Sequence, residues 1–133
     1  MTSRIFGSGI RRREDPRLIT GQASYTDDIK LPHMAHVAIL RSPHAHARIR
    51  SIDPGPALEM PGVMAVVTSA DLPEVSAEMA DMGEGAAVNY GFYSRNVMAR
   101  EKALYRGHAV AAVAATSTHI AEEALSRIVV DYE

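Results

Sequence analysis

The sequence contains no cysteine in its 133 residues. Without thiolates, this chain by itself cannot form a disulfide, a zinc–thiolate cluster or a cysteine-ligated iron–sulfur centre, and it has no cysteine nucleophile. Many classes of metalloprotein and enzyme are therefore excluded for the chain alone.

Aromatic residues are scarce as well, with no tryptophan, two phenylalanines and five tyrosines. Hydrophobic residues still make up 47% and charged residues 23%, proportions that are typical of soluble globular proteins. Because alanine supplies many of the apolar positions, each buried side chain removes little area from water. We expect one small α+β domain with a thin core.

The chain has neither a strong charge nor a long hydrophobic run. Its formal net charge is -2, whereas domains dedicated to nucleic acids are usually basic, so no nucleic-acid partner is expected. The longest apolar run, residues 109–115, falls far short of the roughly 20 residues that a membrane span needs. The arginines at 11–13 precede acidic residues at 14–15, where a signal peptide would begin its apolar segment. We predict a cytoplasmic protein without a membrane span.

Glycine and proline breaks divide the chain into an arm and a domain. Residues 1–21 carry basic residues without a sustained period, which predicts an extended N-terminal arm with at most a short strand at 17–20. Residues 22–133 form the domain. Within it, the acidic, alanine-rich and glycine-interrupted stretch 74–94 predicts a long loop with room for one helical turn.

Period-two alternation predicts two strands in the first half of the domain, at residues 35–40 and 46–52. Pro43 suits a type I turn between them, so we expect these strands to pair as an antiparallel hairpin. Val37 and Ile39 share one face of the first strand, and we expect that face to be buried.

The second half of the domain has the sharpest pattern. Residues 108–115 are apolar on both alternating faces, which favours a central strand, with an alanine-rich helix as the competing interpretation. Thr118 is the expected N-cap of the one main helix, at 119–127, and a final strand is expected at 128–132.

Two further elements complete the predicted fold: a helical turn at 57–60 and a strand at 63–68. The apolar positions that we expect to be mostly buried are Val37, Ile39, Ile49, Val63, Val66, Val110, Val113, Leu125, Ile128 and Val130.

The histidines are the first candidates for chemistry. His44 and His46 would face the same way on a strand and could present two imidazoles to one metal. Pro43, however, places His44 in a turn, and no acid stands at a recognisable ligand spacing, so surface or hydrogen-bonding histidines are the better interpretation and a metal protein the weaker one. His108 opens the buried strand, where a satisfied core or interface histidine is favoured over an acid or base.

Other motifs carry less information. The glycine-rich stretches 7–9 and 83–85 do not lie between a strand and a helix, and neither is followed by the Gly-Lys-Ser/Thr of a phosphate loop. The acidic pairs at 14–15, 27–28 and 122–123 are typical of solvated faces or helix starts. No serine has a nucleophile-elbow context, so a hydrolase has no support.

Several short motifs follow one another along nearly the whole chain. They are REDPRLITG (13–21), YTDDI (25–29), LP (31–32), RSPHAHARI (41–49), PGVMAVVT (61–68), DLP (71–73), YRGHAVAAV (105–113) and VDYE (130–133). In this order they resemble the opening of the molybdenum-hydroxylase large subunit, a family that includes carbon monoxide dehydrogenase, aldehyde oxidase and xanthine dehydrogenase. The pattern is nearest to that of carbon monoxide dehydrogenase large subunits.

The resemblance implies an α/β-hammerhead fold for residues 22–133, with a small mixed sheet and one main helix near the C-terminus. It departs from many relatives at His33, where glycine is common after Leu-Pro, and at His108, where glutamate or glutamine followed by proline is common. No position inherits a catalytic, cofactor-binding or metal-binding role, because the family places those residues downstream of this domain.

The same resemblance implies a structural and assembly role within an oxidoreductase that oxidises a small molecule such as carbon monoxide, an aldehyde or an N-heterocycle, with water as oxygen donor. Molybdopterin, as the molybdenum cytosine dinucleotide, would be bound by the cofactor-binding remainder of the large subunit. Iron–sulfur centres and FAD would lie in small and medium partner subunits. The chain alone is not expected to be active, and the alternative is a separately encoded protein-interaction module with no enzymatic role.

Overall fold

The N-terminal part of the chain forms its own structural unit. The computed structural model describes residues 7, 9 and 11–133, and the chain divides into two compact units, Met1–Pro32 and His33–Glu133. The first contains α1 (Asp15–Ile19) and the 3-10 turn η1 (Thr26–Asp28). The strand expected at 17–20 is therefore wrong, because Pro16 in the first turn favours the start of a helix. Residues 1–6, 8 and 10 of the expected arm lie outside the described residues.

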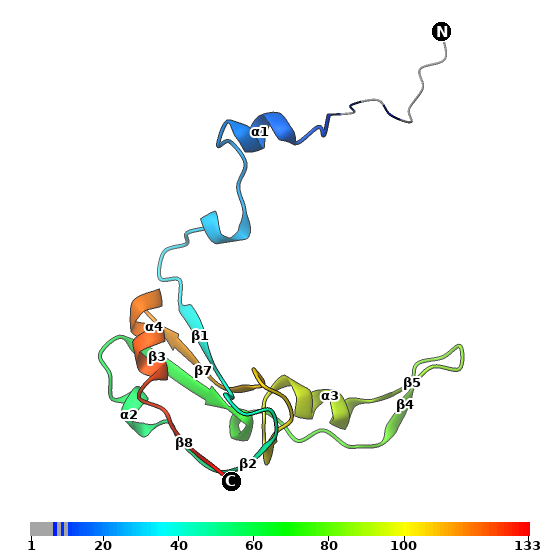
Figure 1. Cartoon of the computed structure of the whole chain (residues 1–133), viewed down its shortest axis with the longest axis vertical. Coiled ribbons are helices and arrows are strands. Elements are labelled where there is room, and N and C mark those ends of the chain that lie inside the picture. The colour runs from blue at the N-terminus through cyan, green and yellow to red at the C-terminus, as the bar shows by residue number, and fades with distance from the viewer. Residues whose placement is uncertain (1–6, 8, 10) are drawn as a thin grey trace. The chain divides into compact units, whose positions relative to one another are not determined.

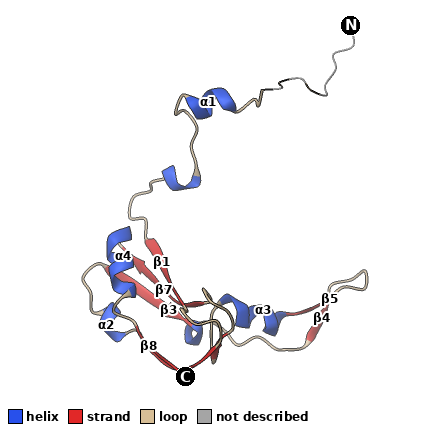
Figure 2. Cartoon of the chain, viewed as in Figure 1, coloured by secondary structure: helices blue, strands red, loops and turns tan. Residues whose placement is uncertain are grey.

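The second unit is built around the central strand β7 (Ala109–Ala115). β7 pairs antiparallel on one side with β1 (His36–Arg41) and on the other with β3 (Val63–Thr68), giving the order β1-β7-β3 (Figures 1 and 2). The predicted central strand is confirmed, and the competing helix is wrong. A strand that is apolar on both faces is suited to this middle position.

One face of this sheet carries the core. The helix α4 (Thr118–Leu125) packs on β1, β7 and β3, and α2 (Gly55–Leu58) packs on β3. The buried cluster that results consists of Ala57, Ala111, Val113, Ala124 and Ile128. Alanine dominates it, so the core is as thin as the composition predicts.

Two of the expected core residues are on the surface. Val37 is 63% exposed and Ile39 is 42% exposed, whereas the remaining predicted positions are buried or half-buried. In β1 the alternate residues His36, Ala38 and Leu40 face inward instead. Alternation in the sequence gives the period of a strand but not its phase, and the phase here depends on which face α4 covers.

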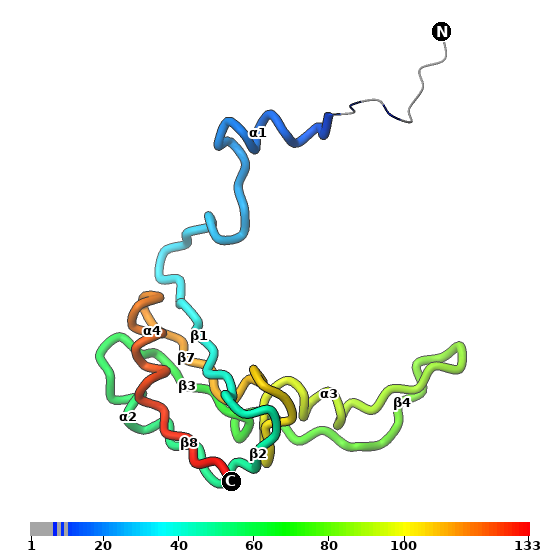
Figure 3. The backbone as a smooth tube through the Cα atoms, in the orientation of Figure 1, coloured from blue at the N-terminus to red at the C-terminus, as the bar shows by residue number. Residues whose placement is uncertain are grey.

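The expected hairpin between residues 35–40 and 46–52 is also wrong. β2 (Ala47–Asp53) pairs with β8 (Val129–Tyr132) and β6 (Lys102–Ala103) in a second antiparallel sheet of order β6-β2-β8. Figure 3 labels the β2 and β8 segments of this sheet. The buried residue Ser42 explains the change of sheet. Its N–H donates to the His108 carbonyl at 2.9 Å, and its carbonyl accepts from the Gly107 N–H at 2.9 Å. The turn is thereby held to the segment before β7.

Residues 74–94 contain more structure than a loop. β4 (Met79–Asp81) and β5 (Ala87–Asn89) form a two-stranded hairpin, and α3 (Tyr90–Val97) follows directly. The side-chain oxygen of Asn89 accepts from the N–H of Phe92 at 2.9 Å and so caps this helix. α3 is as long as α4, so the expectation of only one substantial helix is wrong.

The C-terminal elements lie close to their predicted places. α4 begins one residue earlier than expected, because Ser117 rather than Thr118 is the N-cap and accepts from the N–H of Ile120 at 3.3 Å. The α+β class is confirmed, with three small antiparallel sheets in place of one mixed sheet. No helix in the described part of the chain is long and apolar enough to cross a membrane.

Candidate functional site

The His44 and His46 pair lies in the turn before β2, not on a strand. The backbone N–H of His44 donates to Oγ of Ser42 at 3.1 Å, and its ring contacts the ring of Tyr132 edge-on, with 4.8 Å between centroids. Throughout residues 7, 9 and 11–133, no three His, Asp or Glu side chains gather in a group that could hold a metal ion. The geometry therefore provides no ligand set around either histidine.

His108 is completely buried at the start of β7. Its Nδ1 accepts from the backbone N–H of Leu104 at 3.2 Å. The ring stacks on Tyr105 with centroids 4.5 Å apart. Nε2 has no hydrogen-bond partner among the described residues and no access to solvent, so the expectation of a satisfied histidine holds for Nδ1 and is wrong for Nε2.

Asp71 and Thr68 form a small polar network at the end of β3. Oδ2 of Asp71 accepts from the N–H of Thr68 at 2.7 Å and from the hydroxyl of Thr68 at 3.1 Å. The backbone hydrogen bond and then the hydroxyl hydrogen bond lower the pKa of the Asp71 carboxyl, because both favour its charged form. This network begins the 3-10 turn η2 (Ser69–Asp71) and is structural in character.

The Asp71 network is absent from the sequence-based expectations, although its signal is present in the sequence. Thr68-Ser69-Ala70-Asp71 has the spacing of a capping box, in which the first residue and the carboxylate three positions later satisfy each other's backbone donors.

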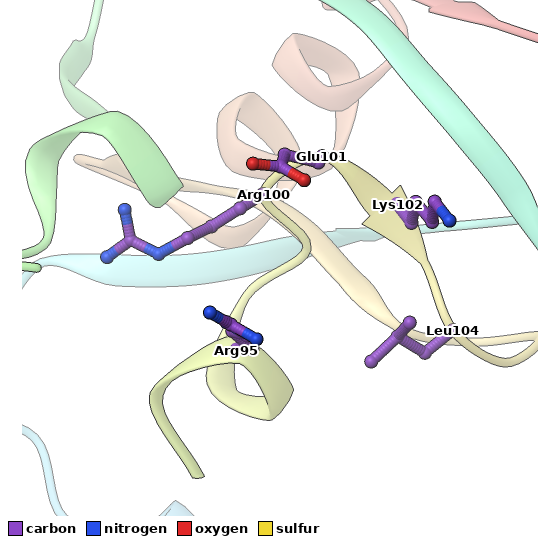
Figure 4. A pocket seen from close by; sticks show the side chains of 5 residues that line it. All are labelled: Arg95, Arg100, Glu101, Lys102 and Leu104. Carbon is purple, nitrogen blue, oxygen red and sulfur yellow. The ribbon is translucent and has the colours of Figure 1, made fainter. Parts of the chain in front are cut away.

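A cavity of about 290 Å³ lies between α3 and β6, and its lining is mostly charged (Figure 4). Arg95, Arg100, Glu101, Lys102 and Leu104 line it. Arg100 is already engaged, because its Nη2 donates to the carbonyls of Leu72 at 3.1 Å and Pro73 at 2.9 Å. Figure 4 shows the side chains of Arg100 and Lys102 extending to opposite sides. Arg100 and Lys102 therefore do not converge on one point.

The remaining candidates are structural. The carboxylate of Asp28 accepts from the N–H of Tyr25 at 2.8 Å, and Glu123 lies 3.7 Å from Arg127 on the surface of α4. The glycines of 83–85 form the turn of the β4–β5 hairpin, with positive φ at Gly83 and Gly85. These placements agree with the interpretation of the acidic pairs as solvated or capping groups.

Comparison with known proteins places the whole domain in a family. Residues 20–133 match the family model described as the aldehyde oxidase and xanthine dehydrogenase a/b hammerhead domain. The carbon monoxide dehydrogenase large chain of Afipia carboxidovorans is 39% identical over 98% of this chain and 16% of its own length.

Solved structures of known oxidoreductases are similar to this chain as well. Quinoline 2-oxidoreductase from Pseudomonas putida superposes with a TM-score of 0.76 and 43% identity over 96% of this chain and 16% of its own. A Cu,Mo-containing CO dehydrogenase superposes with a TM-score of 0.74 and 39% identity over 96% of this chain and 15% of its own. The chain thus spans about a sixth of the length of these relatives. With the family match over residues 20–133 and this identity, the chain belongs to the aldehyde oxidase and xanthine dehydrogenase family and carries its α/β-hammerhead domain.

Proposed function

We propose that this chain is the N-terminal structural and assembly domain of a molybdenum-dependent hydroxylase or dehydrogenase large subunit, and that it is not catalytic alone. One observation carries the proposal: the similarity extends over 98% of this chain but over only 16% of a carbon monoxide dehydrogenase large chain. The complete enzyme oxidises a small molecule such as carbon monoxide, an aldehyde or an N-heterocycle, with water as oxygen donor.

The residues that the structure describes do not fit a molybdopterin or iron–sulfur site. The sequence has no cysteine for a cluster, and at the cavity beside α3 Arg100 is engaged by two carbonyls and extends away from Lys102. His108, the buried imidazole, is closed off by its own packing. We therefore assign no catalytic, cofactor-binding or metal-binding residue to this chain and derive no chemical step through such a group.

The cofactors then belong to the partners of this domain. Molybdopterin, as the molybdenum cytosine dinucleotide, is bound by the remainder of the large subunit, and FAD and iron–sulfur centres by medium and small subunits. Within the chain, we propose residues 22–133 as the hammerhead domain and residues 1–21 as an arm; the family match begins near this boundary, at residue 20, whereas the two compact units of the structure divide between Pro32 and His33. We expect the enzyme in the cytoplasm.

The test is reconstitution of the large subunit with and without this chain. The polypeptide that completes the subunit is co-expressed with the tagged chain, and co-purification, molybdenum content and turnover of carbon monoxide, aldehydes and N-heterocycles are measured. We expect the chain alone to show no turnover, and the remainder to be soluble and loaded with molybdenum only when the chain is present. Turnover by the isolated chain, or failure of the two polypeptides to co-purify, would contradict the proposal; the latter would support an independent interaction module.

A further inference from the structure

The sheet β1-β7-β3 has a second face, opposite α4, that is apolar and open to solvent. Its cross-strand neighbours are Val37, Ala114 and Ala65 in one row and Ile39, Ala112 and Val67 in the next. Residues paired across antiparallel strands project from the same face. We call these six side chains the open face.

The open face is unusual because two of its largest apolar side chains are exposed to solvent. Val37 is 63% exposed and Ile39 is 42% exposed, and the four others are half-buried. Met64, which precedes Ala65 at the register shift of β3, is 60% exposed. A contiguous apolar surface of this kind is typical of an interaction site in a soluble protein.

The opposite face of the same sheet is covered by a helix. There α4 covers the central residues Ala111 and Val113, which are fully buried. Sheets of a domain bury their apolar faces against a further layer, most simply a helix. On the open face, by contrast, the residues of β7 next in sequence, Ala112 and Ala114, are only half-buried.

The dimensions of the open face match one helix. Three strands separated by about 4.8 Å span about 10 Å, close to the diameter of an α-helix with its side chains. The floor consists of alanines on the central strand, flanked by Val37 and Ile39 on β1 and by Ala65 and Val67 on β3. This shallow channel allows the backbone of a helix to approach closely, and no charged side chain belongs to the six residues that form it.

We propose that the open face is the docking surface for one amphipathic helix from the remainder of the large subunit. This inference rests on the proposed function, because the relatives that this chain matches carry about six times its length. The expected helix has apolar residues at i, i+3, i+4 and i+7, which is the pattern of a helix packed on a sheet. Val37 and Ile39, exposed in this chain, become core residues in the assembled subunit.

Cysteine labelling can test this, because the chain contains no other thiol. Val37→Cys places a single thiol on the open face, and Val129→Cys is the matched control, since Val129 is a strand valine that is 59% exposed on the second sheet. Alkylation is followed by mass spectrometry in the isolated chain and in the co-purified large subunit. We expect assembly to slow labelling at position 37 by at least about tenfold, because a packed interface excludes water and reagent. Labelling at position 129 should change less than about twofold.

A second variant and a crosslink complete the test. Ala114→Leu adds bulk to the floor of the open face without a charge, so the isolated chain should keep its melting temperature while co-purification of the remainder falls. A short crosslinker on Val37→Cys should capture a peptide of the large subunit with the helical apolar spacing.

Assembly with equal labelling at position 37 in both states would overturn this inference and leave the proposed function standing. Crosslinking to a second copy of the chain or to another subunit would overturn the choice of occupant, and absence of any assembly would overturn both proposals.

Discussion

The backbone N–H of Leu104 donates to Nδ1 of His108 at 3.2 Å. This fully buried imidazole, one residue before β7, therefore fixes the loop that follows β6. The Tyr105 ring stacks on the His108 ring, with 4.5 Å between their centroids. A residue that looks like a candidate acid or base in the sequence is therefore part of the core.

Substitutions of His108 measure this contact. We expect His108→Ala to lower the free energy of unfolding by about 2–4 kcal/mol, because it leaves a cavity and an unsatisfied Leu104 N–H. His108→Gln keeps a side-chain acceptor and should lie within about 1 kcal/mol of the parent. Urea denaturation of the two variants measures the difference. Equal losses in the free energy of unfolding would show that a side-chain acceptor for the Leu104 N–H is unimportant.

Gly62 adopts a φ of +91°, and a Cβ there would lie 2.8 Å from Cδ1 of Ile120 and 2.9 Å from Oγ1 of Thr116. Gly107 has the same φ of +91°, but a Cβ at this position would meet nothing within 4 Å, which makes it a matched control. We expect Gly107→Ala to cost about 1–2 kcal/mol for the left-handed conformation alone. Gly62→Ala should cost about 1–3 kcal/mol more, because of the contact with α4. If thermal denaturation showed the same loss of stability for both variants, the steric clash of a Cβ at position 62 would be contradicted.

The sequence could predict those elements whose local pattern agrees with their tertiary role. β3 lies at its predicted residues 63–68, and β7 and α4 lie within two residues of their predicted ends. In each, periodicity, β-branched residues or a capping serine or threonine favour the structure that the fold also requires.

Two of the errors, the pairing of β1 and the burial of Val37, concern relationships between distant residues. The pairing of β1 with β7 depends on the hydrogen bonds between Ser42 and the segment at 107–108, far away in sequence, which no local turn signal reveals. The exposure of Val37 also depends on residues far away in sequence, because the position of α4 decides which face of β1 is covered. For the candidate site, the turn at 42–46 keeps the neighbouring histidines off a common strand face, whereas the Thr68–Asp71 capping box has a local signal in the sequence.

His33 adopts a φ of +59°, in the left-handed region that side chains with a Cβ disfavour. This conformation explains why glycine suits the position after Leu31-Pro32. We expect His33→Gly to raise the free energy of unfolding by up to about 1 kcal/mol, because relief of strain outweighs the greater freedom of the unfolded chain. Ala35→Gly, nearby and outside this conformation, should instead lose about 0.5–1 kcal/mol. Thermal denaturation compares the two, and a loss for both variants would argue against strain at His33.

Asp71 gives the chain a pH dependence whose sign follows from its hydrogen bonds. Its pKa is lowered in the folded state, first by the backbone N–H of Thr68 and then by the Thr68 hydroxyl. The carboxylate therefore stabilises the fold at pH values above its unfolded pKa of roughly 3.9, and this contribution is lost as the pH falls through the lower folded pKa.

Asp71→Asn should accordingly lower the melting temperature near neutral pH and converge with the parent in strong acid, where the parent's carboxyl is protonated too. Thermal denaturation of both proteins across this range measures the convergence. Asp131→Asn, which removes a carboxylate from an exposed position of β8, controls for the change in net charge and should stay parallel to the parent. If the curves of Asp71→Asn and the parent were parallel at every pH, the two hydrogen bonds from Thr68 would not be the source of the acid sensitivity.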